Sequence, residues 1–128
     1  MRLLLDTHAF LWFVGKKTNL DSKSLEHIND PNNDIFLSIA SVWEIAIKVR
    51  LGKLQVPQPF EPFITNQLRR NRINSLDITI AHTALIASMP LHHRDPFDRL
   101  LIAQAIIEQM PIISADEAFD AYGITRLR

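Results

Sequence analysis

The amino-acid sequence predicts an α/β fold in which a central parallel sheet is covered by helices on both faces. Short, purely apolar runs alternate along the chain with longer segments of helical length and composition. Strands of a parallel sheet are buried on both faces, so they read as continuous apolar runs rather than as alternating patterns. The chain has 128 residues, 47% of them apolar and 22% charged, which is enough for one domain with its own core.

The first half of the chain contains two predicted strand–helix units separated by a third helix. Apolar runs of three residues are typical of buried strands, and Gly52 is the expected end of the second long helix. In chain order the expected elements are a strand at 3–5, a helix at 7–14, a helix from Asp21 or Ser22 to about Asn29, a turn at 30–33, a strand at 35–37 and a helix at 39–51.

The second half begins with a stiff connection containing Pro57, Pro59 and Pro62. An acidic residue followed by proline, as in Asp95-Pro96, is a typical helix start. The expected elements are a helix at 60–70, a short strand at 73–77, a helix at 78–88, a loop at 90–94, a helix from Asp95 to about Gln109, an apolar run at 110–114 and a last strand at 124–125.

Composition and patterning exclude several classes of protein. The absence of cysteine rules out a disulfide framework, a thiolate nucleophile and a cysteine-ligated metal. No apolar stretch is long enough for a membrane helix, and the apolar N-terminal run is too short for a signal peptide. We found no linker or repeat, so we expect a single cytoplasmic domain over residues 1–128. The net charge of zero argues against a partner held by bulk electrostatics alone.

Acidic residues stand where an α/β sheet usually binds its ligands. Asp6 follows the first predicted strand directly, and Asp116 follows the apolar run at 110–114. Ligands bind beyond the carboxyl ends of strands in such sheets. Glu44 lies in the most apolar helix, where a charge is costly unless it is paired or reaches a polar pocket. Asp95 and Asp98 lie at the start of the helix that leads into the 110–114 run, which a right-handed connection turns toward the same edge.

Several carboxylates on one edge predict a cation site. Converging carboxylates repel one another, and a bound cation relieves that repulsion. Oxygen ligands without cysteine or suitably spaced histidine favour Mg²⁺ or Mn²⁺ over zinc. Such a site supports metal-assisted hydrolysis of a phosphodiester, which needs no nucleophilic side chain.

Each acidic residue also has a purely structural explanation. Asp6, Asp95 and Asp116 could be helix caps or turn residues, and Asp98 gains from the helix dipole whatever its function. Glu44 could be a partly exposed helix residue. The hypothesis of a shared site therefore rests on several of these residues lying at one predicted edge.

Other candidate residues give weaker signals. No Gly-rich loop is present to hold a nucleotide cofactor, and the serines lack the context of a hydrolase nucleophile. Aromatic residues at helical spacing usually pack in a core or an interface. Arg69, Arg70 and Arg72 form a solvated face or contact phosphates or an acidic partner. The remaining candidates are the adjacent loop residues His92 and His93, the scattered His8, His27 and His82, and Ser38, Ser41 and Ser114.

Four segments together resemble the PIN-domain ribonucleases, and most of all the VapC toxins of type II toxin–antitoxin pairs. The resemblance covers nearly the whole chain, and its specificity comes from the order of the four segments. They are LLLDTHAFLW at 3–12, SVWEIAIK at 41–48, HRDPFDRLLIAQA at 93–105 and ISAD at 113–116.

The resemblance implies a three-layer α/β/α PIN-like fold and an endoribonuclease that hydrolyses RNA phosphodiester bonds with Mg²⁺ or Mn²⁺. Asp98 matches a family acid better than Asp95 does, because a hydrophobic pair and then an alanine follow it at 101–103. The implied catalytic, metal-holding residues are Asp6, Glu44, Asp98 and Asp116, with Thr7, Asp95 and Ser114 in supporting positions.

The resemblance also implies partners. A VapB-type antitoxin would lay a helix and an extended tail into a groove leading to the acids, the toxin would form a homodimer, and operator DNA would be bound only through the antitoxin. A metal- or partner-binding PIN module without catalysis remains an alternative. An aspartyl-phosphate enzyme is disfavoured, because His8 stands where its second aspartate is needed, and so is a receiver domain, because Leu5-Asp6 offers a single acid.

The charge balance takes another meaning if the four acids share one pocket. Without these four acids, the chain has 14 basic and 10 acidic residues. A neutralised acidic pocket would then sit on a mildly positive body, so zero net charge does not argue against a polyanionic substrate. We expect RNA affinity to be local, metal dependent and modest in its dependence on salt.

Overall fold

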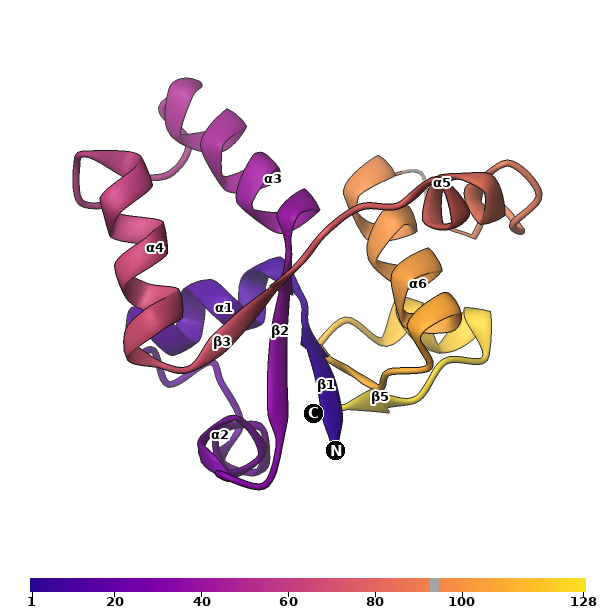
Figure 1. The fold of residues 1–128 in the computed structure, drawn as a ribbon, viewed down its shortest axis with the longest axis horizontal. Helices are drawn as coiled ribbons and strands as arrows, with labels where there is room; N and C mark the ends of the chain where they lie inside the picture. The colour runs from indigo at the N-terminus through magenta and orange to yellow at the C-terminus, as the bar shows by residue number, and fades with distance from the viewer. Residues whose placement is uncertain (93–94) are drawn as a thin grey trace.

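The computed structural model describes residues 1–92 and 95–128, so that His93 and Arg94, which belong to the predicted loop and to the third motif segment, lie outside the described residues. The strands form one all-parallel sheet in the order β3-β2-β1-β4-β5. Their bounds are Arg2–Leu5 for β1, Asp34–Ser38 for β2, Ile73–Leu76 for β3, Ile112–Ile113 for β4 and Arg126–Leu127 for β5. The predicted central parallel sheet is confirmed (Figure 1).

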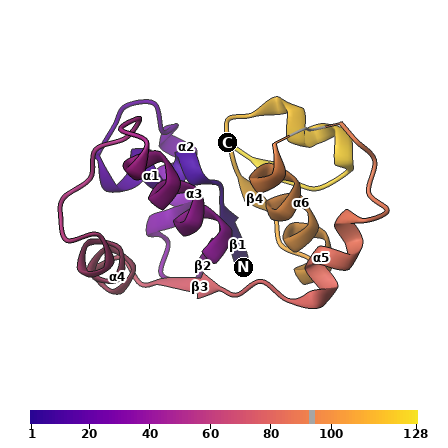
Figure 2. The same ribbon diagram turned by 90° about the horizontal axis from the view of Figure 1, so that it is seen from above.

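Helices cover both faces of this sheet, which confirms the three-layer arrangement. Figure 2 shows α1 to α4 on one side and α5, α6 and the C-terminal segment on the other. The bounds are Thr7–Val14 for α1, Ser22–Asn29 for α2, Ile39–Arg50 for α3, Phe60–Arg70 for α4, Ile80–Ile86 for α5 and Pro96–Glu108 for α6, with a 3₁₀ helix η1 at Glu117–Tyr122.

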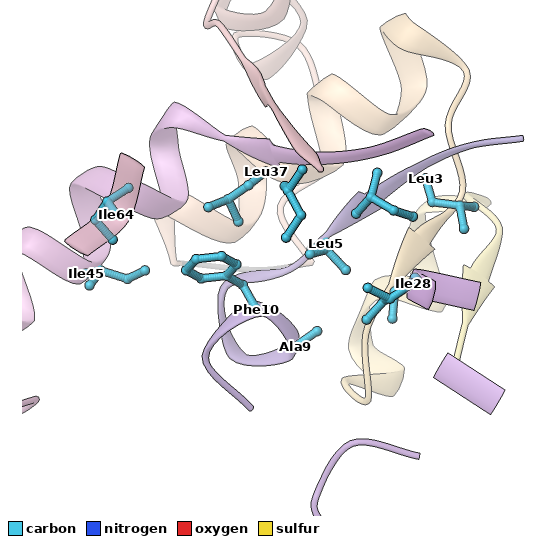
Figure 3. Packing of buried hydrophobic residues seen from close by; sticks show 11 residues of the cluster. Leu3, Leu5, Ala9, Phe10, Ile28, Leu37, Ile45 and Ile64 are labelled. Carbon is cyan, nitrogen blue, oxygen red and sulfur yellow. The ribbon is translucent and has the colours of Figure 1, made fainter. Parts of the chain in front are cut away.

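Alternation along β1 divides the buried residues between two cores. Leu3 and Leu5 pack against the side formed by α1 to α4, together with Phe10 and Ile45 (Figure 3). Leu4 faces the opposite side and packs with residues of α6. Because successive side chains of a strand point to opposite faces, three consecutive leucines are needed to fill both layers.

The strand register brings the ends of β1, β2 and β4 together. Leu5 pairs with Leu37 on one side and with Ile113 on the other. The Asp6 amide continues the ladder by donating to the Ile113 carbonyl at 3.1 Å. The residues that follow these strands therefore lie side by side at the carboxyl edge.

Element boundaries differ from the prediction in the C-terminal third. The last strand lies two residues later than expected, because η1, which the pattern did not predict, ends at Gly123 with a φ of 71°. The helix expected at 78–88 is shorter, because Thr79 and His82 form a capping box that starts it at Ile80. No helix in the described part of the chain is long and apolar enough to cross a membrane.

Candidate functional site

Asp6 is buried at the carboxyl end of β1. Its Oδ1 accepts a hydrogen bond from the Ala9 amide at 2.6 Å, so the side chain caps α1. Burial raises the pKa of the Asp6 carboxyl, while hydrogen bonds from Ser114 and the Ala9 amide act in the opposite direction. The capping role proposed as an alternative is present, and it places the carboxyl at the edge where ligands bind.

Glu44 is buried in α3, with 6% of its surface exposed, so the alternative of a partly exposed helix residue is wrong. The Thr7 hydroxyl donates to Glu44 Oε1 at 2.8 Å, and Lys48 Nζ lies 3.0 Å from Oε2. Thr7 has one hydroxyl proton, so the Ser41 hydroxyl, 2.9 Å away, must donate to Thr7. This chain of hydroxyls fixes the position of one carboxylate oxygen.

Asp98 is half-buried in the first turn of α6. Its pKa is raised to about 7, first by burial and then by the negative charges of Asp95, Glu44, Asp116 and Asp6. The structure therefore brings Asp98 into the electrostatic field of every acid that the sequence selected. Like-charged neighbours of this kind favour the protonated form of a carboxyl group.

The other predicted residues are held by local hydrogen bonds. Asp95 Oδ1 accepts from the Phe97 and Asp98 amides at 2.8 and 3.2 Å and caps α6. Asp116 Oδ1 accepts from the Ala118 amide at 3.0 Å and caps η1. Ser114 is buried, and its Oγ accepts from the Asp116 amide at 3.0 Å. Both aspartates thus have the capping roles that the pattern allowed.

The donor atoms of this cluster suit a hard cation. They are carboxylate oxygens with the Thr7 and Ser114 hydroxyls beside them, the ligand type that Mg²⁺ and Mn²⁺ prefer. Within residues 1–92 and 95–128, however, no three Asp, Glu or His side chains lie close enough to hold one ion as placed. An ion held by three of these side chains would have to draw them closer together than they lie in this structure.

An open hollow of about 320 Å³ contains two of the acids, and it is lined by Asp6, His8, Trp12, Ala115 and Asp116. The rings of His8 and Trp12 have their centroids 5.9 Å apart. From the sequence, an aromatic residue such as Trp12 was expected to pack in a core or an interface, and His8 was only one of several scattered histidines. Their spacing of four residues, starting two residues after Asp6, was the available signal.

Lys48 was not selected from the sequence, and Ser41 was considered only among the weaker candidates, yet Lys48 contacts Glu44 and Ser41 contacts Thr7. The position of Lys48 four residues after Glu44 on one helix face could have indicated the ion pair. The hydrogen bond between Thr7 and Ser41 joins two residues that are 34 positions apart in the sequence, and no local pattern indicates it.

The comparison that decides the family covers nearly the whole chain. A family model described as the PIN domain matches residues 3–124. The chain belongs to the PIN domain family. Within it, a stretch of 57 residues is 46% identical to Ribonuclease VapC16 of Mycobacterium tuberculosis. That stretch is 44% of this PIN domain chain and only 40% of the length of the relative.

Solved structures agree with the fold. VapBC2 from Rickettsia felis, bound to a DNA fragment from its promoter, aligns over 99% of this chain and 98% of its own with a TM-score of 0.75 and 16% identity. VapBC-1 from nontypeable Haemophilus influenzae aligns over 99% and 97% with a TM-score of 0.67 and 16% identity. FitAcB from Neisseria gonorrhoeae aligns over 98% and 96% with a TM-score of 0.65 and 18% identity. At these identities the likeness concerns the fold of the PIN domain.

Proposed function

We propose that this PIN domain is an endoribonuclease of the VapC type that hydrolyses RNA phosphodiester bonds with a divalent cation. The observation that carries the proposal is the placement of Asp6 and Asp116 in one hollow at the carboxyl edge of the sheet, with the buried Glu44 hydrogen-bonded to Thr7 directly after Asp6. The pKa of Asp98, raised to about 7 first by burial and then by Asp95, Glu44, Asp116 and Asp6, agrees with it. Carboxylates that gather from the end of β1, α3, α6 and the β4–η1 junction are expected where a cation binds, because a cation relieves the repulsion between them. The match to Ribonuclease VapC16 supports the same reaction.

Asp6, Glu44, Asp98 and Asp116 would hold one or two Mg²⁺ or Mn²⁺ ions. A cation bound there supplies Lewis acidity toward a phosphoryl oxygen and lowers the pKa of water. Thr7 and Ser114 orient the carboxylates of Glu44 and Asp6, in the way that hydrogen-bonding neighbours orient metal ligands. Asp95 holds the first turn of α6, and with it the backbone of Asp98.

The direct test is cleavage of RNA by the purified protein with Mg²⁺ or Mn²⁺, with a chelator, and as Asp6→Asn. An asparagine still accepts from the Ala9 amide, so this substitution keeps the cap and removes the charge. The matched control is Asp30→Asn, which lies in the turn before β2 and accepts from the Asn32 amide. We expect cleavage by the wild type and the control only. Equal cleavage with chelator and with Asp6→Asn would refute the proposal.

A VapB-type antitoxin is the proposed partner, and operator DNA would be bound only through it. Three structural neighbours are complexes of the VapBC or FitAB kind. A groove of about 990 Å³ along α1, α2 and α4 offers Phe13, Leu20 and Leu25 to an apolar helix. We expect the gene immediately upstream to encode a small protein with a DNA-binding N-terminal half. Purified protein must first be checked for a copurified antitoxin, because its removal should restore cleavage.

We further propose that residues 1–128 act as one cytoplasmic PIN domain that forms a homodimer. Ile39, Trp43, Ile47 and Leu51 recur every four residues and leave an exposed apolar stripe along α3. A second copy would cover this stripe. Sedimentation velocity should therefore give a dimer for the wild type and a monomer for Trp43→Ser, whereas a monomeric wild type would contradict the homodimer.

The alternative is a PIN module that binds a metal or a partner without catalysis. The absence of a ready-made ligand triplet among the described residues is the observation in its favour. Titration with Mn²⁺ and a screen of RNA substrates separate the two functions. Cation binding without turnover on any RNA would favour the silent module.

A further inference from the structure

We propose that His8 and Trp12 form the wall that stacks the nucleobase beside the scissile phosphate, and that three lysines bind the phosphates of the strand leading away from it. This inference rests on the proposed ribonuclease function. It names the surface that would recognise single-stranded RNA, and it adds residues that the carboxylate site does not include.

Two hollows meet at the aromatic pair. The acidic hollow contains Asp6 and Asp116. A second one, of about 620 Å³, runs between α1 and residues 53–57; we call it the lysine groove after Lys17, Lys48 and Lys53. Among the described residues, only His8 and Trp12 line both hollows. An RNA strand that runs from the lysine groove to Asp6 and Asp116 would therefore pass His8 and Trp12.

The charges of the two hollows are complementary to a strand with a cation at one phosphate. The described lining of the lysine groove contains three lysines and no aspartate or glutamate. Lys17 and Lys53 are exposed, and Lys48 is 35% exposed although it pairs with Glu44. A chain of phosphates would be attracted to the groove, whereas the acidic hollow accepts a phosphate only with a cation.

The aromatic pair is suited to a base. His8 is exposed and Trp12 is half-buried, on one face of α1, and their rings are tilted by 41°. Base–aromatic stacking tolerates any base and needs an accessible ring face next to a positive backbone track. A pair that served packing alone would be expected to lie under other side chains rather than at the rim of two open hollows.

The test uses a short single-stranded oligoribonucleotide that the wild type cleaves, with 2-aminopurine replacing one base at a time around the cut. Binding is measured by fluorescence in the cleavage-deficient Asp98→Asn background. We expect quenching at the nucleotide beside the cut. Trp12→Ala should abolish it and weaken binding about 10-fold or more, the loss expected for one stacked base. Trp12→Phe should retain most of both, and His8→Ala should lose less.

The control for Trp12 is Phe60→Leu, at an aromatic residue that begins α4 and lines neither of these two hollows. It should keep the quenching and the affinity. A folded Trp12→Ala protein with unchanged quenching would overturn the proposal. If Trp12→Ala does not fold, the base scan with Trp12 intact decides, and the absence of any quenched position would overturn the proposal as well.

The lysine groove is tested by the salt dependence of the same binding. Lys17→Ala and Lys53→Ala should each lower the slope of log affinity against log salt by about 0.7, the value for one phosphate contact on a single strand. Lys23→Ala, on the exposed face of α2, should leave it unchanged. If these variants weaken only the antitoxin complex, the groove serves that protein and the RNA path is wrong.

The two proposals fail in different ways. A wild type that neither binds nor cleaves RNA refutes the ribonuclease function, and this inference with it. If the wild type and Trp12→Ala cleave RNA equally well, only the proposed role of His8 and Trp12 is refuted.

Discussion

The two ends of α6 carry carboxyl groups whose pKa values are shifted in opposite directions. Near the N-terminal end, the pKa of Asp98 is raised to about 7 by burial and by four other carboxylates. At the C-terminal end, the pKa of Glu108 is lowered, first by its hydrogen bond with His82 and also by Arg2. Glu108 Oε2 lies 3.0 Å from His82 Nε2, and Oε1 lies 3.5 Å from an Arg2 nitrogen.

The helix dipole alone would shift both groups the other way. An acid is favoured at a helix N-terminus and disfavoured at a C-terminus, by about 0.3–1 kcal/mol. The observed directions are reversed, so burial and neighbouring carboxylates outweigh the dipole at the N-terminal end, and His82 and Arg2 outweigh it at the C-terminal end. The C-terminal charge is neutralised by residues of this chain. At the N-terminal end, Asp95, Glu44, Asp116 and Asp6 add like charge around the half-buried Asp98, and a carboxyl perturbed in this way is typical of a functional site.

The largest effect should come from Asp98→Asn. Removal of one carboxylate should lower cleavage about 100-fold or more, because a metal site loses several kcal/mol of charge stabilisation with a ligand. The same substitution should raise stability at pH 8 in chelator by about 1 kcal/mol, because it removes the cost of half-burying a charge and its repulsion by neighbouring carboxylates. Cleavage assays and thermal melts measure the two changes.

The raised pKa of Asp98 determines how the stability gain from Asp98→Asn depends on pH. A carboxyl whose pKa is raised in the folded state costs stability as the pH rises from its unfolded value, 3.8, toward about 7. The gain from Asp98→Asn should therefore be present at pH 8 and absent near pH 4. A variant that is less stable than the wild type at pH 8 in chelator would break the contrast between the two ends of α6.

Thr7→Val should have the next largest effect. It removes the donor to Glu44 and the acceptor for Ser41 in a buried place, which costs about 1–3 kcal/mol. Cleavage should fall about 10- to 100-fold, as with other losses of a residue that orients a ligand. Thr7→Ser should restore both. Thr65→Val removes an exposed hydroxyl that bonds a helix carbonyl and is the control. A selective loss of stability, with kcat intact, would limit Thr7 to a structural role.

Cation affinity should depend on pH in the range set by Asp98. Below pH 7 the ion competes with a proton, so affinity should fall about tenfold per unit of pH for each proton displaced. Above about pH 8 it should level off. Calorimetric titration with Mn²⁺ at pH 6 to 8 measures this, and Asp98→Asn should flatten the profile. A wild-type profile that is already flat would mean that Asp98 does not meet the ion.

The carboxyl edge of the sheet could be predicted because its signals are local. Asp6 and Asp116 each follow an apolar run, and parallel strands bring such ends together whatever the rest of the chain does. The apolar surroundings of Glu44 and the position of Asp98 at a helix start made both of them candidates. The resemblance to PIN domains then favoured Asp98 over Asp95. Each N-cap pattern was also correct, since capping and lying at the edge are compatible for a carboxylate with two oxygens.

Residues that act through tertiary contacts could not be predicted. Ser41 has no local signal for its bond to Thr7, and His82 is fully buried between Thr79, Gln104 and Glu108 although the sequence shows only an isolated histidine. The aromatic pair has the spacing of ordinary core residues, and its position at the rim of two hollows depends on where α1 meets residues 53–57. Only the three-dimensional packing distinguishes these residues from ordinary serine, histidine and aromatic residues of a helix.

Glu108→Gln should have the smallest effect and tests the other end of α6. Loss of the charge should lower stability by about 0.5–1 kcal/mol, as expected for an ion pair whose acidic side chain is partly exposed, and should leave cleavage unchanged. Because the pKa of Glu108 is lowered, its contribution is present above the unfolded value of 4.5 and is lost as the pH falls through the folded one. The difference in melting temperature should thus be constant from pH 6 to 8 and shrink in acid. Glu26→Gln on α2 is the control. A loss of cleavage comparable with that of Asp98→Asn would show that the two ends of α6 are coupled, and Glu108 with its partners His82 and Arg2 would then be part of the site.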